Sequence, residues 1–146
     1  MSARRQRQMC IRDSPHTLNE KSNNYLNCPS GGPLVQHSLN MMFEHYLNKK
    51  ITLEKIVQKM CHNPAILFRV NKRGFIRKNY FADIVIIDPR KNYTVDSNNI
   101  LYKCGWSPFE GTKFNSQITH TFINGNLVYE NGLINEDFRG KKISFE

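Results

Sequence analysis

Histidine and cysteine are the residue types in this 146-residue chain that could bind a metal ion or supply a nucleophile and its base. A catalytic zinc site needs three protein ligands around an open position, and spacings such as H-x-H or H-x-x-x-H bring two of them together. The histidines, which show neither spacing, are His16, His37, His45, His62 and His120. Spacing alone therefore predicts no complete metal or catalytic site.

The surroundings of each histidine predict different roles. His37 and His45 belong to one predicted helix, where a separation of over about 10 Å along the axis keeps them from sharing a metal. We interpret His45 as a solvated helix residue and His120 as a surface residue of a strand. We place His62 at a helix end, where the macrodipole favours an imidazolium. His16 stands apart, because it lies in a long loop where no local element explains it.

The cysteines lie far apart and show no C-x-x-C pair, which argues against a zinc ribbon. Without a secretory signal they also give no disulfide framework, so we expect reduced thiols. No histidine neighbours Cys104, which we interpret as packed rather than nucleophilic. The four positions are Cys10, Cys28, Cys61 and Cys104.

The composition is that of a chain with a buried core, since 39% of residues are hydrophobic and the mean hydropathy is −0.57. No apolar run approaches the roughly 18 residues of a membrane span, and no apolar segment follows the N-terminal arginines as in a signal peptide. We therefore expect a cytoplasmic protein with no membrane partner.

A net charge of +9 and a pI near 9.6 raise nucleic acid as a possible partner. Four arginines and one aspartate lie within residues 1–14, however, so residues 15–146 carry only +6. Of the 17 other basic residues, ten form short pairs typical of turns and solvated strand rims. We predict no nucleic-acid partner, and a basic binding module stays an alternative that salt-dependent DNA retention tests.

The first residues have a composition unlike the rest. Residues 4–14 read Arg-Arg-Gln-Arg-Gln-Met-Cys-Ile-Arg-Asp-Ser, which matches the conceptual translation of a transposase-based sequencing-library adapter. We hypothesise that residues 1–14 are a non-native leader and exclude them from fold reasoning. A basic disordered arm is the alternative, and resequencing intact genomic DNA separates the two.

The first half of the remaining chain predicts a loop and helices. Residues 15–33 are rich in Asn, Ser, Pro and Gly and predict a long loop. Apolar spacing predicts a helix over residues 34–48. A second helix starts after Thr52 as N-cap and ends near His62. Asn63 and Pro64 then resemble a new helix start, so residues 65–68 predict one more short turn.

The second half predicts antiparallel strands. Residues 82–88 contain a β-branched run that suits a buried strand. Residues 117–123 and 127–129 flank an Asn-Gly turn, the pattern of a hairpin. Shorter runs surround residues 131–132 and 139–140. Together the elements predict an α/β class.

Five ordered motifs carry a resemblance to a known family. They are Pro15-His16-Thr17 with Glu20-Lys21 and Pro29–Pro33; Lys59–Ala65; Arg73-Gly74-Phe75-Ile76 leading to Ala82-Asp83; Cys104-Gly105-Trp106-Ser107-Pro108-Phe109-Glu110-Gly111; and Thr121–Gly125. The ordered set resembles the C-terminal part of the dihydroorotase and allantoinase-like branch of the cyclic amidohydrolases, and it covers residues 15–146.

The resemblance implies a metal-dependent (β/α)8 barrel flanked by a small composite β-sandwich. A complete barrel needs about 250 residues, so we expect a C-terminal remnant. On this interpretation residues 15–68 are the strand-eight loop and following helices, and residues 69–146 are a segment of the sandwich.

The resemblance also implies an activity for the parent enzyme, the reversible zinc-dependent hydrolysis of dihydroorotate to N-carbamoyl-aspartate in pyrimidine biosynthesis. Its implied partner is that small substrate, and its implied assembly is a homo-oligomer. Two alternatives stay open: an allantoinase or hydantoinase acting on another cyclic ureide, and a catalytically dead partner subunit.

Residue by residue, the resemblance implies a substrate-binding role for His16, at the substrate's carboxylate, and for the backbone of Leu34, at its ring. Arg12 holds the position of the family's catalytic aspartate and Asp13 is out of register, so we assign no catalytic residue. The metal ligands of the family lie upstream, so we assign none here and expect an inert chain. Asn79 stands where glycine is common, and asparagine tolerates the left-handed turn.

Overall fold

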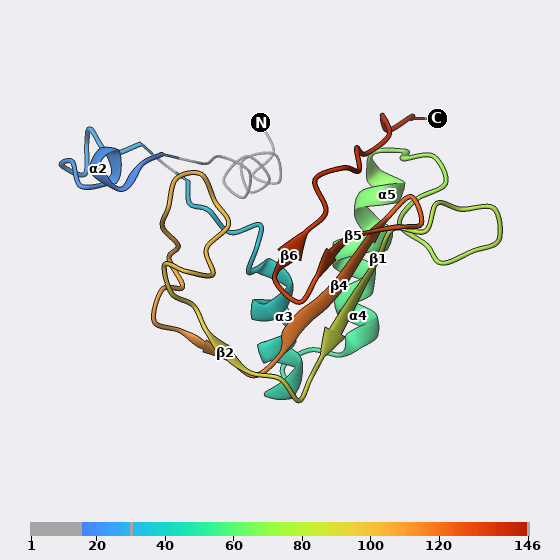
Figure 1. Ribbon diagram of the computed structural model, residues 1–146, viewed down its shortest axis with the longest axis horizontal. Coiled ribbons are helices and arrows are strands. Elements are labelled where there is room, and N and C mark those ends of the chain that lie inside the picture. The colour runs from blue at the N-terminus through green and yellow to red at the C-terminus, as the bar shows by residue number, and fades with distance from the viewer. Residues whose placement is uncertain (1–15, 30, 146) are drawn as a thin grey trace. The chain divides into compact units, whose positions relative to one another are not determined.

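The helices of the chain precede its strands in the computed structural model, which describes residues 16–29 and 31–145 (Figure 1). The elements in order are α2 (Leu18–Lys21), α3 (Ser38–Leu47), α4 (Leu53–Val57), the π-helical turn η1 (Gln58–His62), α5 (Asn63–Leu67), β1 (Ile84–Asp88), β2 (Tyr93–Thr94), β3 (Lys113–Phe114), β4 (Gln117–Ile123), β5 (Asn126–Glu130) and β6 (Leu133–Ile134). This confirms the mixed α/β class. The predicted leader, with Arg12 and Asp13, lies outside the described residues.

Two compact units divide the chain. The first contains the described residues up to Leu39 together with Thr94–Phe114, and the second contains Asn40–Tyr93 and the residues from Asn115 onward. The predicted division at residues 68 and 69 concerns the domains of a longer enzyme and stays a prediction. Within the described part of the chain, no helix has the length and apolar character that crossing a membrane requires.

The second unit is built on an antiparallel sheet with strand order β1-β4-β5-β6 (Figure 1). Asn124 and Gly125 join β4 to β5 with φ angles of 53° and 83°. Two successive positive φ angles are the mark of the hairpin turn whose twist matches its strands. The predicted hairpin is therefore confirmed. Asn131 and Gly132, with φ angles of 45° and 100°, form a second turn of this kind before β6.

The helix predicted from residue 34 begins later, at Ser38. Residues 35–37 form a turn instead. The backbone N–H of Gln36 donates to the hydroxyl of Tyr102 at 2.6 Å, and its side chain exchanges hydrogen bonds with the backbone of Asn99 and Leu101. These tertiary bonds hold the segment as a turn, whereas apolar spacing reports only the local pattern.

The second helix also departs from its predicted end. Thr52 caps α4 as predicted, but the chain stays helical past His62 to the end of α5. Asn63 has helical φ and ψ angles of −62° and −43°, and its N–H donates to the carbonyl of Gln58, five residues back. Pro64 has no N–H and its ring clashes with a regular preceding turn. The wider π-turn accommodates the proline, so the predicted break does not form.

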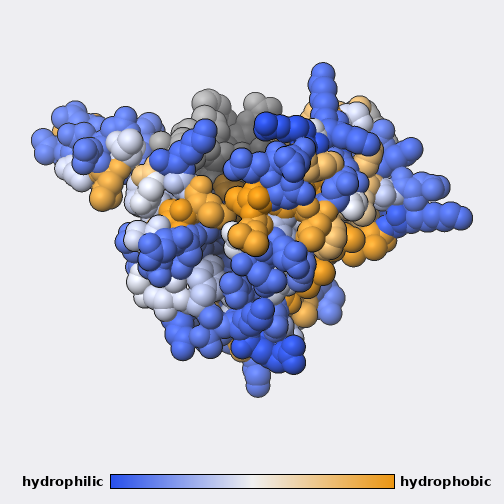
Figure 2. Space-filling view, in the orientation of Figure 1, coloured by the Kyte–Doolittle hydropathy of each residue, from blue (hydrophilic) through white to orange (hydrophobic). Residues whose placement is uncertain are grey.

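Strand β1 forms as predicted but is not buried. Val85 is 46% exposed and Ile86 45% exposed. A β-branched run predicts a strand without saying what covers it. Other large apolar side chains are also exposed, among them Ile66, Leu67 and Ile76, and Figure 2 shows several apolar patches on the face in view.

The segment after α5 passes directly against the helix. Gly74 has a φ angle of +79°, and a Cβ built on it would lie 2.4 Å from the Cβ of Ala65 and 2.9 Å from the carbonyl oxygen of Cys61. Only glycine fits such an approach. Asn79 has a φ angle of 66°, which confirms the expected left-handed turn.

Gly74→Ala should therefore destabilise the chain. Overpacking in a left-handed backbone costs about 3 kcal/mol, and we expect the free energy of unfolding, measured by circular dichroism in urea, to fall by that amount. The control is Gly140→Ala, whose Cβ meets nothing within 4 Å and which should cost less than about 0.5 kcal/mol. Equal losses in the two variants would contradict the packing described.

Candidate functional site

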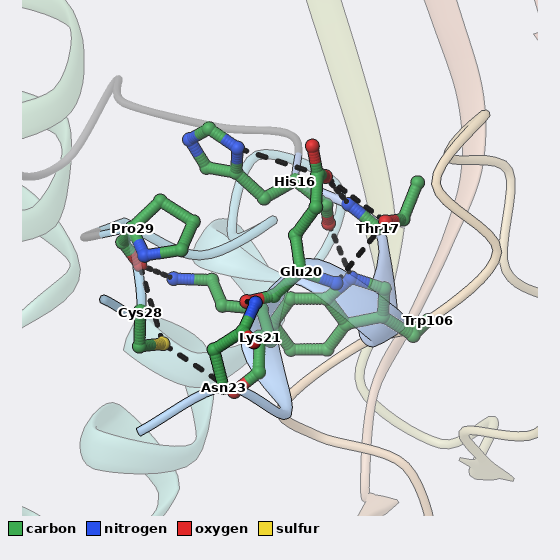
Figure 3. A network of polar contacts seen from close by, with 8 residues as sticks. All are labelled: His16, Thr17, Glu20, Lys21, Asn23, Cys28, Pro29 and Trp106. Carbon is green, nitrogen blue, oxygen red and sulfur yellow. Dashed lines mark hydrogen bonds and ion pairs between the residues drawn. The ribbon is translucent and has the colours of Figure 1, made fainter. Parts of the chain in front are cut away.

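His16 lies in the first unit, immediately before α2, where a capping box orders the chain (Figure 3). Thr17 Oγ1 accepts from the Glu20 N–H at 3.4 Å, and Glu20 Oε2 accepts from the Thr17 N–H at 2.6 Å. The two residues thus satisfy each other's backbone donors. The same backbone bond from Thr17 lowers the pKa of Glu20, so this carboxyl is ionised at neutral pH.

His16 is contacted on its ring and on its backbone. Its Nδ1 lies 3.8 Å from Glu20 Oε2, and its side chain is 37% exposed. Its carbonyl oxygen accepts the indole N–H of Trp106 at 2.8 Å (Figure 3). With Nδ1 turned to Glu20, Nε2 is the ring nitrogen left for a ligand.

The loop that follows α2 is tied at its base. Lys21 Nζ donates to the carbonyl oxygen of Pro29, and Cys28 Sγ lies 3.3 Å from the carbonyl oxygen of Lys21 (Figure 3). Tyr25 and Leu26, between these ties, are 94% and 91% exposed. The loop therefore has a closed base and an apolar, open tip.

Leu34 is half-buried, and its carbonyl oxygen accepts the N–H of His37 at 3.2 Å. A carbonyl has a second lone pair, so one acceptor position remains for a ligand. Across residues 16–29 and 31–145, no hydrogen bond or ion pair joins Leu34 to His16. The structure therefore places both predicted residues in one unit without linking them directly.

His37 is a buried residue that the sequence patterns missed. Its side chain is fully buried, with Nδ1 3.2 Å from Ser107 Oγ, which also accepts the Phe109 N–H. The hydrogen bond between Nδ1 and the hydroxyl can run in either direction, and Nε2 is buried with no hydrogen-bond partner among the described residues. Around it pack the rings of Tyr102, Phe109 and Phe114. The aromatic residues at positions 102, 109 and 114 lie close together in the sequence, and this spacing was the sequence feature that could have indicated a buried cluster.

The other histidines have structural surroundings. His45 is exposed, as predicted. His62 stacks on Phe75 with ring centroids 4.3 Å apart inside a continuous helical segment, so the predicted helix-end role is wrong. His120, 30% exposed, pairs with Glu130 at 3.4 Å. In the part of the chain that the structure describes, no three His, Cys, Asp or Glu residues gather as a metal site.

Comparison with known sequences finds one protein family and similar proteins that carry a single name. Residues 13–128 match the model of the amidohydrolase family. A dihydroorotase of Pyrococcus furiosus is 32% identical over 130 residues, which are 89% of this chain and 30% of the relative. A dihydroorotase of Clostridioides difficile is 33% identical over 117 residues, 80% and 27% of the two chains. The chain thus spans about 30% of the length of the curated relatives it matches.

Two solved structures resemble the chain in three dimensions. An L-hydantoinase (dihydropyrimidinase) from Arthrobacter aurescens has a TM-score of 0.68 and 30% identity, covering 76% of this chain and 25% of that one. A dihydropyrimidinase from Brevibacillus agri has a TM-score of 0.73 and 23% identity, covering 82% and 27%. The second likeness shows the fold alone.

The buried histidine should make the first unit sensitive to acid. Burial lowers the pKa of His37 and raises that of Tyr102, which stays neutral in this range. The unfolded chain then binds a proton more readily than the folded one, so stability falls as the pH drops through about 6.5, by at most about 1.4 kcal/mol per pH unit.

Fluorescence of the single tryptophan follows urea unfolding of this unit at pH 7.5 and 5.5. His37→Gln should reduce the loss between the two pH values, because glutamine does not titrate. His45→Gln removes an exposed histidine and should leave the loss as in the unaltered chain. An unchanged loss in His37→Gln would contradict the assignment.

Proposed function

The chain belongs to the amidohydrolase family, and we propose that it is the C-terminal part of a hydrolase that opens the cyclic amide of dihydroorotate. The observation that carries the proposal is similarity of about 30% identity to proteins named dihydroorotase over 80–89% of this chain. The family match spans residues 13–128 and so includes both segments of the site, around His16 and around Trp106.

Within that reaction we assign this chain the task of holding the substrate. Hydrolysis adds water across the ring C–N bond and yields N-carbamoyl-aspartate. In the proposal His16 contacts the substrate's carboxylate through Nε2, the ring nitrogen that faces away from Glu20. A hydrogen bond from an imidazole to a carboxylate is charge-assisted and directional. The backbone of Leu34 meets the ring of the substrate.

The proposed place of the chain in the complete fold follows the same resemblance. Residues 15–68 form the strand-eight loop and closing helices of a (β/α)8 barrel, and residues 69–146 form part of a β-sandwich. The antiparallel order β1-β4-β5-β6 supports the second assignment, since sandwiches are built from such sheets.

The amidohydrolases are generally metal-dependent, but the described residues of this chain do not fit a metal ion. His16 has Glu20 beside it and no third acidic, histidine or cysteine group within the described residues. We therefore derive no step through a metal and limit the mechanism to binding and orientation.

A hydantoinase is the second candidate. The L-hydantoinase from Arthrobacter aurescens is 30% identical over 76% of this chain, a similarity close to that of the dihydroorotases. Hydantoin carries no carboxylate, whereas dihydroorotate does. The proposed role of His16, to bind a carboxylate, is therefore consistent with dihydroorotate and has no counterpart for hydantoin.

The complete gene, recovered and expressed, tests this choice. We expect dihydroorotate to be turned over with kcat/KM at least about 100-fold above hydantoin or allantoin, because a site built for a charged group discriminates strongly against a ligand without it. A preference for hydantoin or allantoin would overturn the proposal in favour of its alternative. No activity on any of the three would favour a dead partner subunit.

The 146-residue chain itself should be inert. Purified and supplied with zinc, it should show no turnover of dihydroorotate, because the described residues bring no metal ligands together. The Pyrococcus furiosus dihydroorotase under the same conditions serves as the positive control. Zinc-stimulated turnover by the chain, removed by chelator, would refute this prediction.

A further inference from the structure

We propose that Trp106 and Glu20 are positioning residues that together direct the His16 imidazole, with Trp106 fixing its backbone and Glu20 its ring. The inference rests on the proposed function, in which His16 binds the substrate's carboxylate. It adds residues that have no contact with substrate in that proposal. In the proposal both affect substrate binding through His16.

Trp106 supplies a donor from a distant part of the sequence. Its indole N–H bonds the His16 carbonyl at 2.8 Å across 90 positions of the chain. The contacted group is the backbone of His16, so the bond holds the start of α2 whatever the imidazole does. The tryptophan side chain has one hydrogen-bond donor, and in Trp106 that donor bonds the His16 carbonyl.

The turn that carries Trp106 is itself anchored. The N–H of Gly105 donates to the carbonyl of Tyr102 at 3.0 Å, and Gly105 has a φ angle of 71° that suits a tight turn. On the other side, the N–H of Gly111 donates to the carbonyl of Val95 at 2.8 Å, and Val95 is 1% exposed. The indole donor thus projects from a turn fixed at both ends, which makes it a suitable reference point for His16.

Glu20 acts on the ring. One oxygen, Oε2, accepts from the Thr17 N–H at 2.6 Å and from the Thr17 hydroxyl at 2.9 Å, and lies 3.8 Å from His16 Nδ1. Because the capping box holds the carboxylate, its charge has a fixed place next to the imidazole. A carboxylate only accepts hydrogen bonds, so in the proposal both ring nitrogens carry hydrogen. Nδ1–H then faces the Glu20 carboxylate, and Nε2–H, on the opposite side of the ring, donates to the substrate's carboxylate (Figure 3).

Two conservative substitutions distinguish a role in positioning His16 from a role in general stability. Trp106→Phe keeps an aromatic ring and removes the donor. Glu20→Gln keeps an oxygen that can accept from Thr17, since glutamine also serves in capping boxes, and removes the charge beside His16. Tyr102→Phe is the matched control, because it removes one hydrogen-bond partner, for the Gln36 N–H, from the same unit without contacting His16.

A double-mutant cycle in the enzyme encoded by the complete gene tests the proposal. Trp106→Phe and Glu20→Gln should each raise KM for dihydroorotate about tenfold with a smaller effect on kcat, the size expected when a supporting contact is lost. In a His16→Ala background neither should raise KM further, because each acts through His16. Tyr102→Phe should leave KM unchanged. Additive effects in the His16→Ala background would overturn the proposal.

Nuclear magnetic resonance of the 146-residue chain gives a readout independent of activity. The His16 imidazole signal, assigned by its loss in His16→Gln, should shift in Trp106→Phe and in Glu20→Gln and stay in place in Tyr102→Phe. An unmoved His16 signal in the first two variants would overturn the proposal.

The two measurements also separate failure of the inference from failure of the proposed function. If His16→Ala leaves KM unchanged, His16 does not bind the carboxylate and the proposed function loses that role. The His16 signal then still decides whether Trp106 and Glu20 hold the residue. If His16→Ala raises KM and Trp106→Phe does not, the inference alone is wrong.

Discussion

The hydrogen bond from the indole N–H of Trp106 to the carbonyl oxygen of His16 holds the start of α2 to the rest of the first unit. The unit is made from two stretches of chain that lie far apart in sequence, so neither can fold into it alone. The same stretches are also joined by Gln36, which bonds the backbone of Asn99 and Leu101, and by the contact of His37 with Ser107. In the bonds made by Trp106 and Gln36 at least one partner is a backbone group, which has less freedom to move than a flexible side chain.

This arrangement explains how a segment of irregular structure can carry a binding residue. Loops lose more entropy on ordering than they regain from few contacts, and binding loops are therefore held by a rigid scaffold. Here the scaffold is the turn around Trp106 and the buried packing of His37 against Phe109 and Phe114. The short α2, too small to be stable alone, is ordered by its capping box and by the ties on either side.

Short sequence patterns correctly predicted the features that depend on a few neighbouring residues. Asn124 with Gly125 predicted the hairpin, Thr52 predicted the start of α4, and Asn79 predicted a left-handed turn, because each depends on neighbouring backbone angles alone. The patterns failed where distant groups decide. The tertiary bonds to Gln36 delayed the start of α3. The helix also continued through Pro64, for a local reason that the pattern did not show, the π-turn before the proline. No periodic pattern in the sequence predicts the contact between Trp106 and His16. The motif around Trp106 was noticed only because it resembles a motif of the family.

Hydrogen exchange of the one indole N–H in the chain tests the central claim most directly. With tryptophan labelled by ¹⁵N, a single indole signal reports on Trp106. If its N–H is held by the His16 carbonyl, exchange in native buffer should be slower than in the urea-unfolded chain by about tenfold or more, and Tyr102→Phe should preserve that protection. Exchange as fast as in the unfolded chain would contradict the account, because the two stretches of the first unit would then not be joined at His16.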